Sequence, residues 1–404
     1  MIDTLLSRSA LLMQGSAIRR IGGLMGQIPD LVSFAGGYPA DEAFPTEAFR
    51  EIAADVLAGP TRRSLQYGAT AGYRPLREAI GAIMRSRGID RPAGELIVTT
   101  GSQQGLDLLS RVILDPGDVV LLERPSYTGA ILAFRNIGAT MVGVGQDDDG
   151  IDLDDLARTA AAQRALGRRV KMLYVVPNFQ NPAGCLLPRA RRLALLEWAL
   201  REEILLLEDD PYGELYFSDA ASEEDTRPIA ADDRDNRAVV YLSTFSKMLA
   251  PGFRVGWVSA PAALAARLEI AKQGVDLHSG SLDQMIVYEA CRRGVLVAQG
   301  PKLRRLYQEK RDVMMAALCT GGPGPLRWVT PRGGFFLWAH LTPPLTSESL
   351  LTAAVTQGVI FVPGTAFHVD DGGQDTLRLS FAEPTPERIA LGIGRLLAAA
   401  SAAI

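Results

Sequence analysis

The chain has 404 residues, of which 47% are apolar and 22% charged, proportions that are ordinary for a soluble globular protein and that exclude a fibrous or disordered chain. Its formal net charge is −4, from 42 basic and 46 acidic residues, so it lacks the basic surplus of a nucleic-acid-binding protein. A chain of this length can bury a sizeable core and is expected to form two domains.

Cysteine and histidine are few and widely spaced, which argues against a disulfide framework and against a zinc site; they are Cys185, Cys291, Cys319, His278, His340 and His368. We expect no bound metal. The first fifteen residues mix charged side chains into a short apolar stretch, unlike a secretory signal or a transit peptide. No apolar run approaches the ~18 residues of a transmembrane helix. We therefore expect a cytoplasmic protein without a membrane partner.

The N-terminal segment, residues 1–45, is expected to be an extended arm. It contains SAIRRI from Ser16 and then SFAGGYP, in which Gly36 and Gly37 could let the backbone approach a ligand closely, although a simple turn fits as well. Residues 47–58 and 75–84 have helical patterns, and the loop between them places Tyr67 next to a glycine.

A strand predicted over residues 95–99 leads directly into GSQQG and then into a helix with Leu106, Leu109 and Ile113 on one face. A strand, a glycine-containing turn and a helix N-terminus together offer backbone N–H groups to a phosphate. The turn lacks the spacing of a dinucleotide fold and the Lys of a P-loop, so neither of those sites is supported. Many such turns bind no ligand.

Further strands are predicted over residues 118–122, 171–176, 204–207, 238–242 and 255–260. Residues 143–150 (GVGQDDDG) lack the alternating ligands of a calcium loop and are predicted to form a turn. The acidic stretch 218–236 is predicted to be a solvated surface loop.

Polar residues follow the ends of these strands, where open α/β sheets usually bind their ligands. Asn181 lies in PNFQNPAG, and Asp209 and Tyr212 lie in EDDPYGEL. A carboxylate and a phenol so placed suit the nitrogen and the oxygen of a cofactor ring, although an acidic surface turn is an equally simple interpretation.

The stretch from Ser243 to Trp257 reads STFSKMLAPGFRVGW. Lys247 follows Thr244 and Ser246 and precedes Arg254. A lysine whose pKa is lowered in a dry, cation-bearing pocket can form a Schiff base, and two hydroxyls with a guanidinium suit a phosphate. Together they point to pyridoxal phosphate, even though a single loop lysine is more often a solvated surface charge.

Alternation of strands and helices over residues 95–260 predicts a mostly parallel α/β sheet. A long helix over residues 301–318 and strands over 333–339, 359–362 and 376–380 predict a smaller α+β unit. We therefore predict an arm that is part of the small domain (1–45), a cofactor-binding large domain (46–290) and a C-terminal small domain (291–404).

The motifs together resemble those of fold-type I, class I/II aminotransferases that use pyridoxal phosphate, above all the 2-aminoadipate and kynurenine aminotransferase-like branch. The resemblance extends over nearly the whole chain and rests on GSQQGLD, RPSYTGA, PNFQNPAG, EDDPYGEL, STFSKMLAPGFRVGW and LRLSFA. It implies transfer of an amino group between an L-α-amino acid and a 2-oxo acid, with 2-oxoglutarate as the expected acceptor.

The resemblance also implies roles for individual residues. Lys247 would be the Schiff-base lysine and the proton carrier, and Asp209 would keep the ring nitrogen protonated. Tyr212 and Asn181 would bond the ring oxygen, and Tyr127 would stack on the ring. The phosphate would be held by Ser102, Gln103, Thr244, Ser246 and Arg254. Arg378 would bind the substrate α-carboxylate, helped by the backbone of Gly36.

Two further expectations come from the family pattern. Tyr67 would reach the cofactor phosphate of the opposite subunit, which makes the protein a homodimer with composite active sites. Arg19, with Arg20 as the near alternative, would swing to bind the distal carboxylate of an acidic substrate, although two adjacent arginines can equally be solvated.

Other functions remain open at this point. A lyase, a racemase or a cyclising enzyme on the same fold would share Lys247, Asp209 and Arg378. Transcription regulators with this fold carry an N-terminal winged helix, for which the ~30 residues before SFAGG leave no room. A globular α/β protein without a cofactor would lack the yellow colour of bound pyridoxal phosphate.

Overall fold

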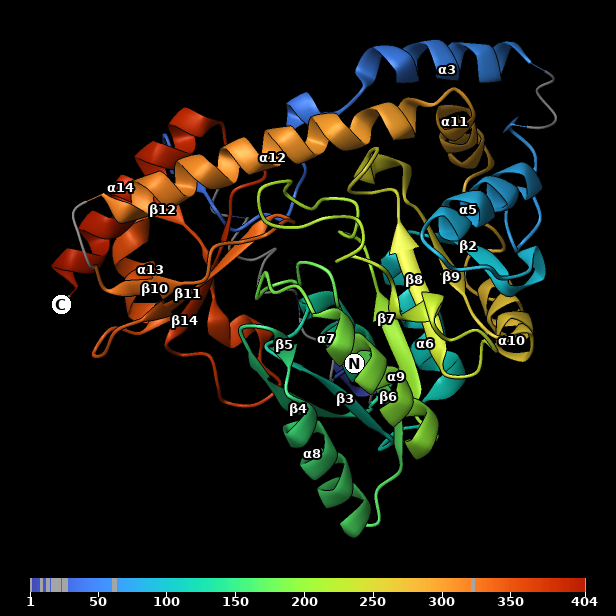
Figure 1. Ribbon diagram of the computed structural model, residues 1–404, viewed down its shortest axis with the longest axis horizontal. Helices are drawn as coiled ribbons and strands as arrows, with labels where there is room; N and C mark the ends of the chain where they lie inside the picture. Colours follow the sequence, from blue (N-terminus) through green and yellow to red (C-terminus); the bar gives the residue numbers. More distant parts are fainter. Residues whose placement is uncertain are drawn as a thin grey trace.

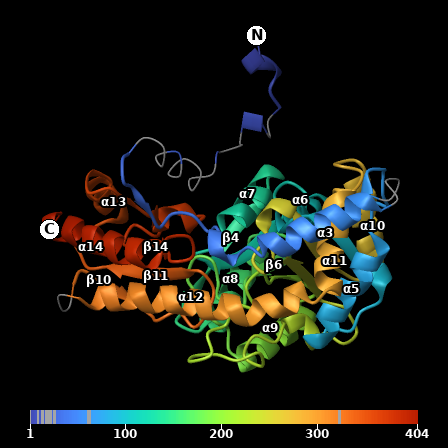
Figure 2. The same cartoon turned by 90° about the horizontal axis from the view of Figure 1, so that it is seen from above.

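The computed structural model describes residues 2–7, 10–11, 15, 23, 28–59, 64–320 and 324–403. Two units built on separate sheets lie side by side, and the long helix α12 (Val295–Cys319) runs along both of them (Figures 1 and 2). Arg19 and Arg20 lie outside the described residues.

The larger unit is built on a mixed sheet whose central strands are parallel. In spatial order its strands are β2 (Leu96–Thr100), β9 (Val255–Ser259), β8 (Val239–Thr244), β7 (Leu205–Asp209), β6 (Val170–Val175), β3 (Val119–Arg124), β4 (Thr140–Asp147) and β5 (Gly150–Ile151). Strands β8, β7, β6, β3 and β4 run parallel, whereas β9 is antiparallel to both of its neighbours. The predicted mostly parallel sheet is confirmed.

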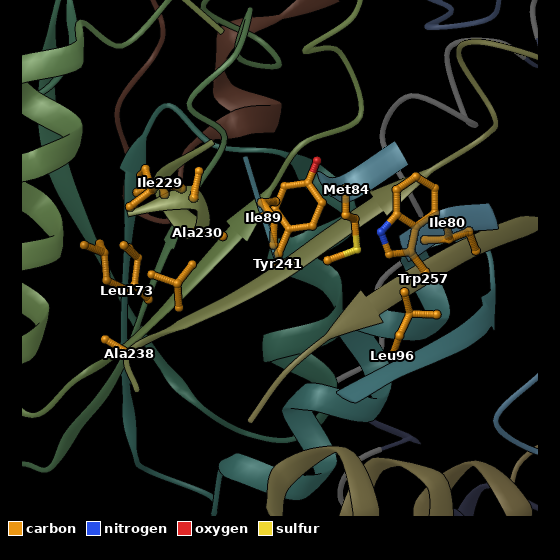
Figure 3. Close-up of a cluster of buried hydrophobic side chains, with 14 of the residues drawn as sticks. Ile80, Met84, Ile89, Leu96, Leu173, Ile229, Ala230, Ala238, Tyr241 and Trp257 are labelled. Carbon is orange, nitrogen blue, oxygen red and sulfur yellow. The ribbon is translucent and has the colours of Figure 1, made fainter. Parts of the chain in front are cut away.

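Helices cover both faces of this sheet, which is why its strands are apolar on both sides. One core cluster includes residues of α3 (Thr46–Ala58), α5 (Arg74–Ser86), α8 (Leu153–Ala165), α9 (Arg189–Glu202) and α11 (Ser281–Arg292). The cluster on the opposite face includes residues of α6 (Ser102–Ile113), α7 (Thr128–Asn136) and α10 (Ala262–Gln273). In α5, Ile80 and Met84 are one helical turn apart and pack beside Trp257 of β9 (Figure 3).

The smaller unit combines an antiparallel sheet with a short parallel pair. The sheet strands are β10 (Leu326–Trp328), β11 (Phe336–Leu341), β14 (Thr376–Ser380) and β13 (Val362–Pro363), and the parallel pair is β1 (Val32–Ser33) with β12 (Val359–Ile360). Helices α12, α13 (Ser347–Thr356) and α14 (Pro386–Ala402) complete its core. Pairing of β1 with β12 brings part of the N-terminal arm into this unit. The domain limits at residues 45 and 290 stay a prediction, since α12 runs without a break between the two units.

Short 3-10 helices connect these elements: η1 (Ile2–Leu5), η3 (Asp41–Ala43), η4 (Ala93–Glu95), η5 (Ile229–Ala231), η6 (Pro251–Phe253) and η7 (Gly364–Phe367).

The turn predicted over residues 143–150 is wrong for most of its length. Strand β4 continues to Asp147, and only residues 148 and 149 form the turn before β5. Glycines 143 and 145 weaken the strand signal in the sequence, but β4 pairs with β3 as far as Gly145 and with β5 at Gln146 and Asp147. Pairing with a neighbouring strand outweighs the low intrinsic preference of glycine for a strand.

The loop predicted to be solvated over residues 218–236 is in part buried. Ile229, Ala230 and Ala231 belong to the core of the large unit. Their backbone is held by the buried carboxylate of Glu208, which accepts hydrogen bonds from Ile229 N (2.8 Å) and Ala230 N (2.9 Å). The acidic residues around this segment led to the prediction of a solvated loop, although three apolar residues within it are buried.

Candidate active site

A cavity of about 980 Å³ lies where the parallel strands of the large sheet end, and residues of the smaller unit also line it. The carboxyl ends of parallel strands meet at one edge of a sheet, so residues distant in sequence converge there. Most of the predicted site residues line this cavity: Ser102, Gln103, Tyr127, Asn181, Asp209, Tyr212, Thr244, Ser246, Lys247, Arg254 and Arg378.

Lys247 follows β8 in a turn and directs its amine into the cavity. The Nζ atom donates a hydrogen bond to the Gly37 carbonyl at 3.0 Å and lies 5.5 Å from the centre of the Phe335 ring. Burial, together with the positive charges of Arg378 and Arg254, lowers the pKa of Lys247 to about 8. About a tenth of this amine is therefore uncharged at pH 7, far more than for an ordinary lysine, and a nucleophile or a proton acceptor must be uncharged.

Asp209 is the last residue of β7 and is almost fully buried. Its Oδ2 accepts a hydrogen bond from the Tyr174 hydroxyl at 2.9 Å, whereas its Oδ1 is buried without a hydrogen-bond partner among the described residues. Burial raises the pKa of this carboxyl to about 7. A buried carboxylate oxygen without a donor costs free energy, so this atom fits a ligand that brings an N–H group.

Arg378 lies in the middle of β14 and is 1% exposed. It donates from Nη1 to Asn181 Oδ1 at 2.7 Å, and its guanidinium lies 4.2 Å from the centre of the Phe336 ring. Its Nε has no hydrogen-bond partner, and no carboxylate of the described residues forms an ion pair with it. Burial lowers the pKa of Arg378 to about 10. A buried guanidinium in this state suits the carboxylate of a small ligand.

One end of the cavity has the features of an anion site. Helix α6 begins at Ser102 directly after Gly101, whose φ of 74° is the left-handed conformation that favours glycine. A Cβ atom at Gly101 would collide with the guanidinium of Arg254. The free N–H groups and the dipole of the helix N-terminus thus lie beside a cation.

Two hydroxyls complete this end of the cavity. Thr244 Oγ1 lies 2.9 Å from Ser246 Oγ, and Ser246 N donates to Thr244 Oγ1 at 3.1 Å. The side chain of Gln103 is engaged with the Gly129 carbonyl at 2.8 Å, so Gln103 offers its backbone to an anion. This set of donors fits a phosphate group.

Tyr212 and Tyr127 flank the space between Lys247 and Asp209. Tyr212 is buried, packs edge-on against Phe335 and Phe336, and is hydrogen-bonded to the side chain of Asn181. Burial raises the pKa of the Tyr212 phenol above its ordinary value. Tyr127 lies at the start of α7 and lines the same cavity.

Two predicted site residues do not line the cavity. Gly36 is buried beside it, where a Cβ atom would lie 2.6 Å from the Tyr38 ring; its neighbour Gly37 is the residue that contacts Lys247. Tyr67 is 79% exposed and packs edge-on against His278 at 5.8 Å. Within one chain, therefore, Tyr67 does not reach the cavity.

The sequence analysis missed Tyr174 and Phe336, which contact Asp209 and Arg378 respectively. Tyr174 is an inward-facing residue of β6, and it is hidden in the sequence by the apolar strand around it. Phe336 on β11 supports the guanidinium of Arg378. A polar tip near the end of a predicted buried strand is the one signal that could have identified Tyr174.

Neither a metal site nor a membrane span is found in the described part of the chain. No group of three or more His, Cys, Asp or Glu residues there could hold a metal ion. None of its helices combines the length and the hydropathy needed to cross a bilayer.

Solved structures resemble this fold along its whole length. A multiple-substrate aminotransferase from Thermococcus profundus superposes with a TM-score of 0.93 at 39% identity and covers 100% of this chain and 98% of its own. The α-aminoadipate aminotransferase from Thermus thermophilus, solved with N-(5'-phosphopyridoxyl)-L-leucine, gives a TM-score of 0.89 at 38% identity, with 100% and 99% covered. These are fold-type I enzymes, so the predicted fold class is confirmed.

Sequence comparison agrees with the structural comparison. An aromatic-amino-acid aminotransferase from Thermococcus litoralis is 41% identical over 392 residues, which are 96% of this chain and 92% of the relative. The family model for aminotransferase class I and II matches residues 30–396, which include every cavity-lining residue predicted from the sequence. The chain therefore belongs to the class I and II aminotransferases.

Proposed function

We propose that this aminotransferase uses pyridoxal 5'-phosphate to move the amino group of an L-α-amino acid to a 2-oxo acid, with 2-oxoglutarate as the expected acceptor. The observation that carries the proposal is the Oδ1 atom of Asp209, which is buried without a hydrogen-bond partner among the described residues. It lies in the cavity that Lys247, an amine of lowered pKa, also lines. A protonated pyridine nitrogen is the donor that this oxygen lacks.

The residues present fit the cofactor at each of its groups. Ser102, Gln103, Thr244, Ser246 and Arg254 would hold the phosphate at the N-terminus of α6. Asp209 would bond the ring nitrogen, Tyr212 and Asn181 the ring oxygen, and Tyr127 would lie on the ring face. When bound, the cofactor supplies an electron sink for the Cα of the substrate.

Lys247 would hold the cofactor through Nζ and later move a proton at the substrate Cα. A pKa of about 8 supports this role, because the amine can accept a proton and return it without a large change in free energy. The Gly37 carbonyl, 3.0 Å from Nζ, orients the amine when it is not engaged with a ligand.

Arg378 would bind the α-carboxylate that amino donor and oxo acceptor share. Its bond to Asn181 and its contact with Phe336 fix the guanidinium in one orientation, which a two-pronged bond to a carboxylate requires. The unpartnered Nε supports this assignment.

We further propose a cytoplasmic homodimer in which Tyr67 completes the site of the other subunit. Tyr67 is 79% exposed and does not line the cavity of its own chain, so its ring is accessible to a second chain. Arg19 would bind the distal carboxylate of 2-oxoglutarate. Gly15, which precedes Arg19 by a few residues in the sequence, lines the cavity.

The proposal is tested with the purified protein and its cofactor. A visible absorbance band should appear on loading, and reduction with borohydride followed by peptide mapping should place the label on Lys247. The chain has four other lysines, Lys171, Lys272, Lys302 and Lys310. A label on any of these contradicts the assignment. Product formation from an amino acid should also require a 2-oxo acid; turnover without one indicates a lyase, a racemase or a cyclising enzyme.

A further inference from the structure

Glu123, near the end of β3, is a buried carboxylate that the proposed chemistry does not use. It is 2% exposed, and no described lysine, arginine or histidine forms an ion pair with it. Its Oε2 accepts hydrogen bonds from Val176 N at 2.9 Å and from Gln180 Nε2 at 3.2 Å, and its Oε1 accepts one from Gln146 Nε2 at 3.0 Å. Burial without a cation raises the pKa of Glu123 to about 7.

Gln180 connects this carboxylate to two active-site loops. Its Nε2 also donates to the Pro125 carbonyl at 2.8 Å, two residues before Tyr127. Its Oε1 accepts from Ala183 N at 2.7 Å, and its side chain is fully buried. The two backbone partners of Gln180 each lie two residues from a proposed cofactor-binding residue: Pro125 from Tyr127, and Ala183 from Asn181.

A stability role alone explains this arrangement poorly. Burying a carboxylate that has no cation is costly, and an apolar side chain of similar size would fill the same space at lower free energy. What the carboxylate provides is geometry, since it orients three donors: Val176 N and Gln180 Nε2 from the segment after β6, and Gln146 Nε2 from β4.

We propose that Glu123 and Gln180 are positioning residues: they hold the turn at 180–184 against the loop at 124–127 and thereby fix Asn181 between Arg378 and Tyr212. The inference rests on the proposed function, which makes Asn181 a ligand of the cofactor ring and an orienter of the carboxylate-binding Arg378. The Asn181–Arg378 hydrogen bond of 2.7 Å is the contact through which the Glu123–Gln180 pair acts on the substrate.

The structure supplies a conservative variant of Glu123. In Glu123→Gln the amide oxygen can still accept from Val176 N and from Gln180. The new amide nitrogen would face Gln146, whose Oε1 is buried without a partner and can accept once that amide turns over. Glu123→Gln therefore keeps the hydrogen bonds, whereas Glu123→Ala removes them.

A matched control lies at the opposite end of the sheet. Asp233 is 5% exposed, and its carboxylate accepts from the backbone N–H groups of Ala238 (3.0 Å) and Val239 (2.8 Å), where β8 begins. Unlike Glu123, Asp233 has a cation beside it, since Arg91 Nη2 lies 3.7 Å from its Oδ2. Asp233→Ala removes a buried carboxylate far from the end of β8 that leads to Lys247, and it therefore controls for a general loss of stability. It should lower the melting temperature without changing substrate binding.

The experiment compares Glu123→Ala, Gln180→Ala, Glu123→Gln and Asp233→Ala with the cofactor-loaded parent. We expect Glu123→Ala and Gln180→Ala to raise KM about three- to tenfold for amino donor and oxo acceptor alike, the effect of losing one hydrogen bond in support of Arg378. The pKa read from the visible band of the bound cofactor should rise, because a displaced Asn181 donates less well to the ring oxygen. Glu123→Gln should match the parent in both measurements.

Three results would overturn the inference: unchanged KM and band pKa in Gln180→Ala, a Glu123→Gln chain as impaired as Glu123→Ala, or equal changes in Asp233→Ala. If Glu123→Ala does not fold, the KM values and band pKa values of Gln180→Ala and Glu123→Gln test the inference without it. Failure of the proposed function is distinguishable, because the parent itself would then show neither the visible band nor amino transfer.

Discussion

The carboxylates of Asp209 and Asp210, neighbours in sequence, have opposite surroundings. Asp209 lines the cavity with one oxygen unpartnered, whereas Asp210 Oδ2 is bonded to Arg87 Nη1 at 2.6 Å and to the Tyr241 hydroxyl at 2.9 Å. Successive residues of an extended backbone point to opposite sides, which places Asp209 at the cavity and Asp210, directly after β7, against the buried Arg87.

This relationship separates two substitutions that look alike. Asp209→Asn should fold and lose activity, with kcat lower by roughly 10²–10³-fold, because the ring nitrogen would lose its charge-stabilising partner. Asp210→Asn should instead lose roughly 3 kcal/mol of unfolding free energy, since the buried Arg87 loses its counter-charge. Urea unfolding and steady-state kinetics on both chains check this. Near-normal turnover in Asp209→Asn would contradict the assignment.

Lys247→Ala should abolish amino transfer, with kcat lower by roughly 10⁴-fold or more, yet still bind the cofactor without a covalent bond. The anion site at the start of α6 and the carboxylate of Asp209 do not depend on the lysine. Equilibrium dialysis measures the retained binding. Lys302→Ala, an exposed position on α12, is the control and should behave as the parent. Complete loss of cofactor binding in Lys247→Ala would show that the phosphate donors are misassigned.

The stability of the cofactor-free protein should depend on pH through Asp209. Its pKa is about 7 in the folded chain and near 3.8 when unfolded, so between these values the folded state binds the extra proton and stability falls as pH rises. Asp209→Asn removes this dependence. We expect the cofactor-free variant to be more stable than the parent at pH 8 and the difference to shrink by pH 4, as measured by urea unfolding. A difference that stays constant with pH would contradict the raised pKa.

The sequence predicted the parts of the site that stand at strand ends. Lys247, Asp209 and Asn181 each follow a recognisable apolar strand, and the convergence of parallel strand ends brings them together. Tyr174 and Glu123 are harder to recognise because they lie within buried strands, where a sequence pattern shows that a residue faces the interior but not which residue it contacts. Which oxygen of a carboxylate lacks a partner depends on packing between distant segments, and no local pattern encodes it.

Strand β4 shows the corresponding limit for the fold. The glycines and the aspartate of β4 have a low preference for strands. The segment is extended because it pairs with β3 and, at its end, with β5. Tyr67 shows another limit, because an exposed aromatic residue has no visible role until a second chain is considered.

The proposed contribution of Tyr67 to the opposite subunit can be tested with mixed dimers of Tyr67→Phe and Lys247→Ala chains. If Tyr67 acts across the interface, one site of each mixed dimer carries both defects and the other is intact, so activity should approach half that of the parent. Phenylalanine keeps the edge-on contact with His278 and removes only the hydroxyl. Activity that never exceeds that of the two separate homodimers would place Tyr67 in its own subunit's site or in none.

The final prediction concerns how one cavity accepts both an acidic and an apolar side chain. Arg378 is held by Asn181 and Phe336, so we expect it to bind the α-carboxylate common to all substrates and not to move to a distal one. A distal carboxylate needs a second cation, and we propose Arg19, which follows the cavity-lining Gly15 by a few residues in the sequence. Arg19→Ala should therefore raise KM for 2-oxoglutarate while leaving an apolar or aromatic donor nearly unchanged, because only the acidic partner loses a charge-assisted bond worth ~1.5–3 kcal/mol.

Arg20→Ala is the matched control for Arg19→Ala, since it removes the same charge from the adjacent position, and Arg378→Lys is the positive control. A lysine cannot reproduce the fork that bonds a carboxylate and Asn181 together, so Arg378→Lys should raise KM for both substrates. If Arg19→Ala impairs donor and acceptor equally, Arg19 supports the structure and the distal carboxylate is bound elsewhere. If Arg20→Ala raises KM for 2-oxoglutarate selectively and Arg19→Ala does not, the second cation is Arg20. The two substitutions remove the same charge, so such a difference would show which side chain binds the acidic substrate.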